Sequence, residues 1–327
     1  MSSDKVIRLF YPLSRKTIDT YTVIRFYYPN SEIRINVSGV VESFLSRLIY
    51  RKVLFDRVIE GIVLPQEVNV ALNGKVNCLH PGRDMVKSLN DKDAFDDVCR
   101  SNQILVPKTW NEDFLLNEPT KLIFKPKIGA GSRGIKIIEC DSGLVQVQKD
   151  YICQEYLGND NKIYGFFAFA VKGKVQSSYC HERIETYPKK GGVSVLSKLY
   201  ENEKLHNTAC DVVRKLNYTG LLMIEFKHYQ NKFYVIEINP RLWGSVLFCL
   251  SIKDNPVTSY LNHRGLKKPT REALGREFLV WLFPYGLFRR NVYKHLSKAL
   301  LINYGYDSAR ANYFTRVLVT ILAKVVR

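Results

Sequence analysis

The residues best suited to chemistry lie in one stretch, Gly220–Ser245, where acidic and amide side chains interrupt two apolar runs. Glu225 belongs to the first run and Glu237 to the second, and Asn239 follows Glu237 by two positions, which places both on one face of a strand. A buried carboxylate is costly without a partner. Two acids and an amide around one point suit Mg²⁺, which takes oxygen ligands and leaves other positions to substrate phosphates. The set therefore predicts a divalent-metal site.

Arg241 follows Asn239 by two positions and would place a fixed positive charge beside that metal, where it suits a phosphoryl group in transfer. The alternative is an ordinary amphipathic hairpin whose acids face solvent. The Asn-Pro-Arg sequence directly after the second acid argues against it, since a proline at a solvated strand edge normally marks only the strand's end. The expected strands are Leu221–Phe226 and Phe233–Ile238, joined by a polar turn at His228–Lys232.

A second stretch, Leu122–Ile138, places a lysine near the end of an apolar strand, followed by a glycine-rich loop and another strand. Glycines let backbone N–H groups approach phosphate oxygens, and Lys125 would supply a point charge. The loop is not a Walker A motif, because a strand and not a helix follows it. A plain glycine-rich turn is the alternative. The loop residues are Gly129, Gly131, Ser132, Arg133 and Gly134.

The Glu-x-Asn-Pro-Arg sequence after an apolar strand, preceded by a Gly-x-x-x-x-Glu-Phe strand, resembles the metal-binding end of the ATP-grasp superfamily of ATP-dependent carboxylate ligases. The resemblance extends over Leu89–Ser245, with its elements in the family's order. Asn90 or Asp91 can cap a helix that runs to about Ser101. Its Asp-Lys-x-x-Phe pattern resembles that of the family, which makes Lys92 the first phosphate lysine. A solvated helix lysine is the alternative. The placement of Lys125 before a proline resembles the lid that folds over the triphosphate.

The apolar strand Tyr151–Leu157 resembles the family's hinge, whose backbone groups pair with adenine. The resemblance places Gln154, Glu155 and Leu157 at the adenine edge and Asp160 near the acid that usually holds the ribose.

The His-x-Arg…Gly-Gly-x-Ser pattern of Ser178–Lys198 resembles a carboxylate–amine ligase subgroup, related to carbamoyl-phosphate synthase. There, Arg183 and the loop with Gly191 and Gly192 lie at the active-site mouth. Arginine can hold a carboxylate with two hydrogen bonds, and paired glycines let a loop approach a ligand. His181 by itself is more typical of a structural histidine.

Length, leader pattern and cysteines limit the class of protein. A chain of 327 residues forms two or three compact units. It shows no secretory pattern, and its longest apolar run, Phe278–Phe288, is shorter than the roughly 20 residues that span a bilayer. The 7 cysteines form no Cys-x-x-Cys pair, which argues against a disulfide framework or a zinc site. We expect a cytoplasmic protein.

The net charge of +18 is concentrated near the C-terminus: residues 262–327 hold 13 Lys and Arg against 3 Asp and Glu, a surplus of 10. Within this range, Tyr313–Arg327 repeats apolar residues at helical spacing. Such a helix either packs on its own domain or lies on an anionic membrane, here the inner face. A nucleic-acid-binding protein without ligase activity would also explain the charge, but it would leave the acids of the hairpin without a role.

The N-terminal residues predict a small α/β unit without a dinucleotide-binding glycine motif, with strands at Val6–Leu13, Ile33–Val37 and Val58–Leu64 and a helix at Val40–Arg57. Together these patterns predict an α/β (α+β) protein with an ATP-grasp fold. The expected parts are a small N-terminal α/β domain at 1–90, an ATP-grasp core at 91–255 with its lid at about 109–157, and a basic helical extension at 256–327.

The resemblance also implies a reaction. A small carboxylate and ATP, with Mg²⁺ or Mn²⁺, would give an acyl phosphate, and an amine would convert it into an amide. The basic and apolar pattern of the C-terminal residues, and not the resemblance, favours substrates that are lipid-linked or belong to a cell-surface glycan or its precursor. Arg241 and Arg183 are the expected catalytic residues.

Overall fold

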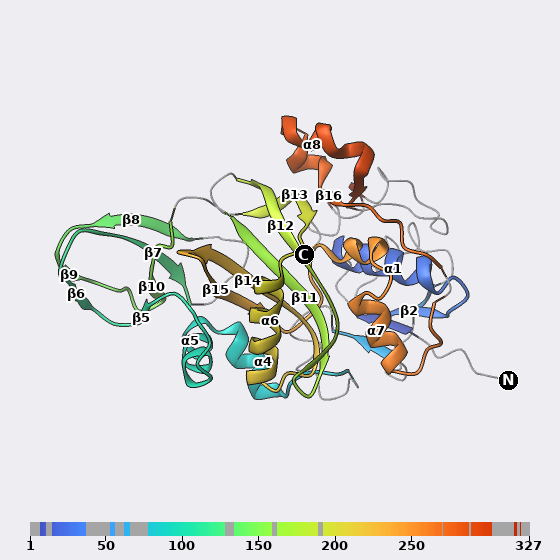
Figure 1. Ribbon diagram of the computed structural model, residues 1–327, viewed down its shortest axis with the longest axis horizontal. Helices are drawn as coiled ribbons and strands as arrows, with labels where there is room; N and C mark the ends of the chain where they lie inside the picture. Colours follow the sequence, from blue (N-terminus) through green and yellow to red (C-terminus); the bar gives the residue numbers. More distant parts are fainter. Residues whose placement is uncertain are drawn as a thin grey trace.

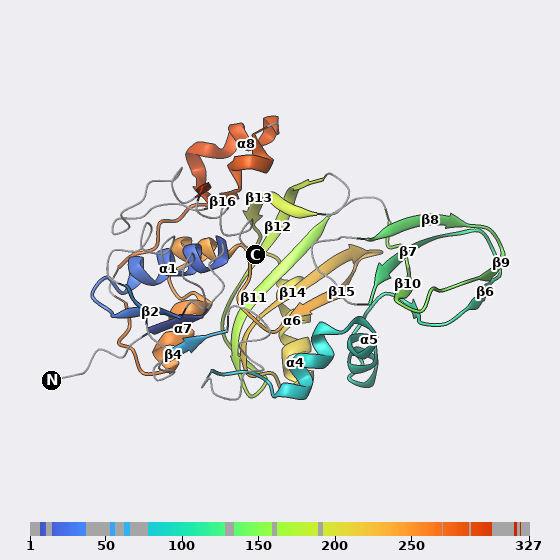
Figure 2. The same cartoon turned by 180° about the vertical axis from the view of Figure 1, so that it is seen from behind.

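The computed structural model has a central sheet with an α/β unit at one end and a smaller sheet at the other (Figure 1, and from behind in Figure 2). The structure describes residues 7–10, 15–36, 53–55, 62–65, 78–127, 134–158, 162–188, 192–269, 271–287, 289–302, 317–318 and 321.

The central sheet has the order β15-β14-β11-β12-β13-β16-β17, and its neighbours from β15 to β16 are antiparallel. Helix α6 packs on one face, whereas α7 and α1 lie over the other, which carries the larger apolar core. The strands are β11 (Ile163–Val171), β12 (Lys174–Tyr187), β13 (Val193–Leu199), β14 (Gly220–Tyr229), β15 (Lys232–Asn239), β16 (Phe278–Val280) and β17 (Ala299–Leu301), and the helices are α1 (Arg15–Tyr27), α6 (Glu203–Lys215) and α7 (Pro256–His263).

The predicted hairpin is confirmed as β14 and β15, with longer strands and a shorter turn. Gln230 and Asn231 form the turn, with φ angles of 44° and 59°. Two successive residues with positive φ are typical of the type I′ turn, whose twist matches that of the flanking strands. The tight turn fixes the register as far as the pair of Phe226 with Val235. A bulge between Glu225 and Phe226 then shifts the pairing by one residue, which places Glu225 directly opposite Glu237.

The predicted lid strands are also confirmed, in a sheet of order β5-β10-β7-β8 beside a two-stranded sheet of β6 and β9. Before them, helix α5 begins as predicted, because the Asp91 side chain accepts hydrogen bonds from the backbone N–H groups of Asp93 and Ala94. The elements are α4 (Arg83–Asn90), α5 (Lys92–Ser101), β5 (Thr109–Trp110), β6 (Phe114–Leu116), β7 (Thr120–Pro126), β8 (Lys136–Cys140), β9 (Gly143–Val145) and β10 (Tyr151–Glu155).

The N-terminal unit is a parallel sheet of order β3-β2-β1-β4 with bounds Ile7–Phe10 (β1), Ile33–Asn36 (β2), Val53–Phe55 (β3) and Ile62–Leu64 (β4). The predicted helix Val40–Arg57 is wrong at its C-terminal end, where Val53–Phe55 is a strand. These β-branched and aromatic residues pair with β2, so tertiary pairing outweighs the helical pattern. Residues 40–52 lie outside the described ranges, and helix α1 was not predicted.

The C-terminal range contains strands as well as the predicted helices. Strand β16 pairs with β13, and β17 pairs with β16, so this range extends the central sheet. Its other elements include the 3-10 helix η3 (Leu296–Lys298), the π-helix η2 (Leu282–Gly286) and α8 (Arg290–His295), and the 3-10 helix η1 (Val246–Ser251) precedes the range. Of the predicted helix Tyr313–Arg327, only 317–318 and 321 are described, and they are helical. Within the described ranges, no helix has the length and apolar character needed to cross a membrane.

Candidate active site

The three predicted metal ligands lie on one face of the β14–β15 hairpin. Glu225 and Glu237 are direct cross-strand partners, and Asn239 pairs with Met223, one step of the same face further along. Glu225 and Asn239 are buried, whereas Glu237 is exposed. The hairpin therefore brings two carboxylates and an amide together.

Glu225 is held in a basic environment. It forms an ion pair with the Nη2 of Arg183, which comes from β12 two strands away. Burial raises the pKa of Glu225, and Glu237 raises it further. Arg183, Arg241 and Lys125 act in the opposite direction and favour the charged carboxylate. Cationic side chains from three separate segments thus compensate the buried acid.

The donor set fits Mg²⁺ with bound phosphates. The Nδ2 atom of Asn239 is buried without a hydrogen-bond partner. Among the described residues, no group of three His, Cys, Asp or Glu side chains could hold a metal by itself. Two carboxylates and an amide are too few for a closed protein site, but Mg²⁺ commonly takes one or two carboxylates and completes its octahedron with water and substrate phosphates. Glu225, Glu237 and the Oδ1 of Asn239 would hold it.

Two lysines from outside the hairpin act on the same carboxylate. Burial lowers the pKa of Lys92 and lowers that of Lys125 to about 8, and in both cases Glu237 opposes the shift. Lys92 also donates a hydrogen bond from Nζ to the Pro126 carbonyl, 2.8 Å away. The lysines and the metal ligands predicted from separate stretches therefore lie within electrostatic range of one another, with Glu237 acting on both lysines.

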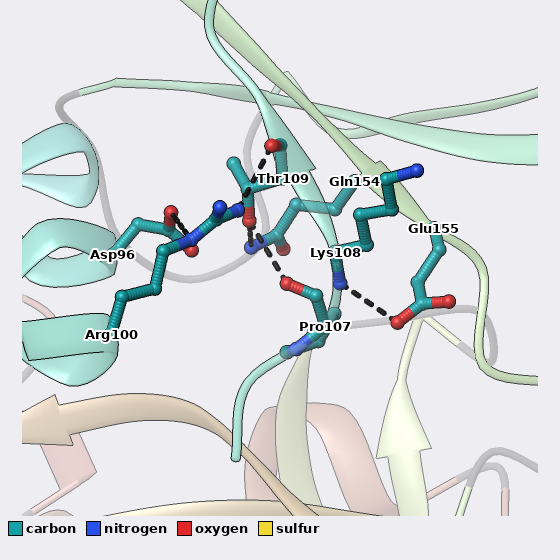
Figure 3. A network of polar contacts seen from close by, with 7 residues as sticks. All are labelled: Asp96, Arg100, Pro107, Lys108, Thr109, Gln154 and Glu155. Carbon is teal, nitrogen blue, oxygen red and sulfur yellow. Dashed lines mark hydrogen bonds and ion pairs between the residues drawn. The ribbon is translucent and has the colours of Figure 1, made fainter. Parts of the chain in front are cut away.

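The Lys125 ammonium is oriented by a chain of buried polar groups. Its Nζ donates to Oε1 of Gln154 at 2.6 Å, and Nε2 of Gln154 donates to Oγ1 of Thr109 at 2.8 Å. Thr109 in turn donates to the Pro107 carbonyl at 3.1 Å (Figure 3). Because each end of the Gln154 amide makes one of these hydrogen bonds, its side chain orients the Lys125 ammonium. The resemblance indicated only the Gln154 backbone, so sequence reasoning missed this role.

The predicted hinge residue Glu155 is hydrogen-bonded to Lys108, which directly precedes strand β5. The backbone N–H of Lys108 donates to Oε1 of Glu155 at 2.7 Å (Figure 3). The backbone N–H of Glu155 donates to the Lys108 carbonyl at 2.9 Å. A hydrogen bond from the Glu155 amide to adenine would have to replace the second contact. Leu157 is buried directly after this strand. Its role at the adenine edge stays a prediction.

Several predicted phosphate-loop and ribose residues lie outside the described ranges, namely Gly129, Gly131, Ser132, Arg133 and Asp160. Gly134 is described and has a φ of +76°. A Cβ at this position would lie 2.8 Å from Cγ of Pro126, so both conformation and space require glycine.

Arg241 and His181 complete the surroundings. Arg241 is half-buried and donates from Nη1 to the Leu242 carbonyl at 3.0 Å. His181 packs edge-on against Phe167 and Phe248, and burial lowers its pKa well below the usual range, with Arg183 acting in the same direction. The packing agrees with a structural histidine, one of the two readings of the sequence.

Comparison with known proteins identifies the fold. Residues 89–245 match the ATP-grasp domain family. None of the curated proteins is significantly similar to the chain in sequence.

Among solved structures, the chain resembles biotin carboxylase of Campylobacter jejuni at 15% identity and a TM-score of 0.58, covering 81% of this chain and 72% of that one. A putative ATP-grasp superfamily protein of Archaeoglobus fulgidus is 16% identical with a TM-score of 0.55, with coverages of 79% and 88%. N5-carboxyaminoimidazole ribonucleotide synthetase of Thermotoga maritima is 13% identical with a TM-score of 0.57, with coverages of 83% and 78%. These likenesses confirm the predicted ATP-grasp fold.

Proposed function

We propose that this chain, which matches the ATP-grasp domain family over residues 89–245, joins a carboxylate to an amine through an acyl phosphate, with ATP and Mg²⁺. The observation that carries the proposal is the meeting of Glu225, Glu237 and Asn239 with Lys92 and Lys125. Carboxylates and lysines around one point suit a nucleotide polyphosphate and its metal, and the buried charge of Glu225 would be costly without the cationic side chains near it.

The reaction has two steps. A carboxylate oxygen attacks the γ-phosphorus of ATP, and ADP leaves. The amine nitrogen then attacks the acyl carbon, loses a proton, and phosphate leaves with the bond electrons. Bound Mg²⁺ would neutralise the phosphate oxygens and hold them in line.

The chain's own residues position and neutralise the reactants. Lys92 and Lys125 face the phosphates, and Arg241 stabilises the charge that moves with the phosphoryl group. Arg183 uses one nitrogen for Glu225, and its other N–H donors can hold the substrate carboxylate. The protein needs no side-chain nucleophile for this chemistry, because binding and orientation supply the rate enhancement.

Hydroxylamine tests the proposal without knowledge of the natural amine. It attacks acyl phosphates and gives hydroxamates, which iron(III) colours. The protein is incubated with MgATP, hydroxylamine and single carboxylates from panels of amino acids, sugar acids and glycan-derived acids. We expect hydroxamate and ADP in equal amounts with one class of acid. ADP release that stays at the background rate with every acid would contradict the proposal.

We further propose that the acceptor is borne by a membrane lipid or glycan precursor and that the C-terminal range docks on the anionic inner leaflet. Basic side chains on and around α8 and η3 support this, since Arg290, Lys294 and Lys298 are exposed. Each basic residue near such a surface contributes about 1 kcal/mol. Leu318 and Ile321 in the C-terminal helical residues are exposed as well, with 56% and 37% of their surfaces accessible, whereas Val317 is buried.

Co-sedimentation with vesicles tests the membrane proposal. We expect the protein to bind phosphatidylserine-containing vesicles at physiological salt, to bind neutral vesicles weakly, and to lose binding as salt rises. Deletion of residues 313–327 should weaken binding. Absence of binding, or binding unaffected by the deletion, would show that the C-terminal range only packs on the protein.

A further inference from the structure

A segment outside the ATP-grasp match, residues 281–291, contacts the end of the β12–β13 hairpin. We call its residues Trp281, Tyr285, Arg289 and Asn291 the C-terminal clasp. Figure 1 shows α8 beyond the ends of β12 and β13. The rings of Tyr285 and Tyr187 stack with centroids 5.1 Å apart and planes 28° apart, and the Arg289 guanidinium lies 5.7 Å from the Tyr187 ring centroid. Asn291 donates to Oε1 of Glu185 at 2.7 Å. Stacking, a cation–π contact and a hydrogen bond therefore join the two segments.

The clasp is itself anchored to the central sheet. The backbone N–H of Trp281 donates to the Val195 carbonyl at 2.9 Å. The Trp281 ring contacts the Tyr285 ring edge-on, with centroids 4.8 Å apart. A Cβ at Gly286 would lie 2.5 Å from the Trp281 carbonyl oxygen, so the chain turns tightly here. Tyr285 is thus connected to strand β13 through Trp281.

The β12 residues that the clasp contacts lie beyond a register shift in the pairing of β12 with β13. The register shifts between Arg183 and Glu185 and again between Glu185 and Thr186. Bulged strands bend, and the direction of the chain beyond the bulge is not set by the ladder alone. Both β12 residues that the clasp contacts, Glu185 and Tyr187, follow the first shift. The clasp therefore contacts the part of β12 whose direction the ladder does not fix alone.

The hairpin tip adjoins the acceptor side of the candidate site. Arg183 stands just before the bulge and pairs with Glu225. On the other side of the tip, Gly192 has a φ of +101°, and a Cβ there would lie 2.3 Å from the Tyr187 carbonyl oxygen. A change in the direction of the tip would move Gly192 relative to Arg183.

We propose that the C-terminal clasp holds the β12–β13 hairpin in the position that completes the carboxylate-binding side of the site, so that Tyr285 is a positioning residue for acceptor specificity. The proposal rests on the proposed function. It assigns to the segment outside the ATP-grasp match a role in binding the carboxylate and none in binding the nucleotide.

The test compares Tyr285→Leu with Tyr293→Leu in the full chain. Tyr293 lies on α8 and is exposed, and its hydroxyl donates to the Leu287 carbonyl, so this control removes a tyrosine of the same segment without removing the stacking, cation–π or Asn291 contacts with β12. For Tyr285→Leu we expect the KM for the carboxylate in the hydroxamate assay to rise about tenfold, since a displacement of about 1 Å can cost on the order of 10²-fold in rate. The Kd for MgADP should stay unchanged. Asn291→Ala, at an exposed position, should give a smaller change in the same direction.

Hydrogen exchange supplies a readout independent of activity. Tyr285→Leu should speed exchange in 185–195 and leave β14 and β15 unchanged. Unchanged exchange in 185–195, an unchanged KM for the carboxylate, or a loss of MgADP affinity equal to that of the carboxylate would overturn the proposal. A wild-type protein that forms no hydroxamate with any acid contradicts the proposed function instead, and the exchange result still decides whether the clasp holds the hairpin.

Discussion

Replacing Glu237 by glutamine should abolish ADP formation while leaving the fold intact. Glu237 is exposed on β15, so the substitution disturbs no packing, but it removes a charge that acts on both Lys92 and Lys125. Loss of one preorganised electrostatic contact to a transition state typically costs about 10²- to 10³-fold in rate, and loss of a metal ligand should cost at least as much. The measurement is the steady rate of carboxylate-dependent ADP release, with the thermal midpoint recorded beside it.

Glu139→Gln is the matched control for this substitution. Glu139 is also an exposed glutamate on a strand, paired only with Lys121 at 3.2 Å, and surface ion pairs contribute little. Its ADP release should equal that of the wild type. If Glu237→Gln turned over at the control's rate, the metal assignment would be wrong.

Removing the charge of Lys125 should weaken nucleotide binding and abolish its dependence on alkaline pH. Burial lowers the pKa of Lys125 to about 8 in the free protein, and bound phosphates would raise it again. Below pH 8 the lysine is charged before the nucleotide arrives, whereas above pH 8 binding must take up a proton. Wild-type affinity for MgADP should therefore be constant below about pH 8 and fall about tenfold per pH unit above it.

Calorimetric titration at several pH values measures this effect. Lys125→Ala should bind MgADP more weakly at neutral pH and should lack the decline above pH 8. Lys121→Ala, on the same strand β7 but paired with Glu139, should follow the wild type. An unchanged affinity in Lys125→Ala, with only the maximal rate reduced, is inconsistent with a ground-state role in phosphate binding.

The sequence was most informative where local pattern and chemistry coincide. Two apolar runs around a polar turn predicted the β14–β15 hairpin, and strand periodicity alone placed Glu237 and Asn239 on one face. The cap of α5 at Asp91 follows from a single side chain. These features depend on neighbours in the chain, so no knowledge of tertiary contacts was needed.

Features that depend on contacts between distant parts of the chain could not be predicted from the sequence. The chain from Lys125 through Gln154 to Thr109 joins three strands, and nothing in their spacing indicates that both ends of one amide are engaged. The ion pair of Arg183 with Glu225 crosses an intervening strand. In the N-terminal unit, Val53–Phe55 forms a strand because it pairs with β2. The local sequence pattern does not indicate this pairing.

Electron paramagnetic resonance of Mn²⁺ in the presence of ADP tests the central claim most directly, because it needs no knowledge of the carboxylate or the amine. The account predicts that the protein binds Mn²⁺ tightly only when ADP is present, and that Glu237→Gln abolishes this binding while Glu139→Gln retains it. Binding of ADP with equal affinity in the absence of a divalent ion, or binding of Mn²⁺ that is unaffected by Glu237→Gln, would contradict the placement of the metal–nucleotide site on the β14–β15 hairpin.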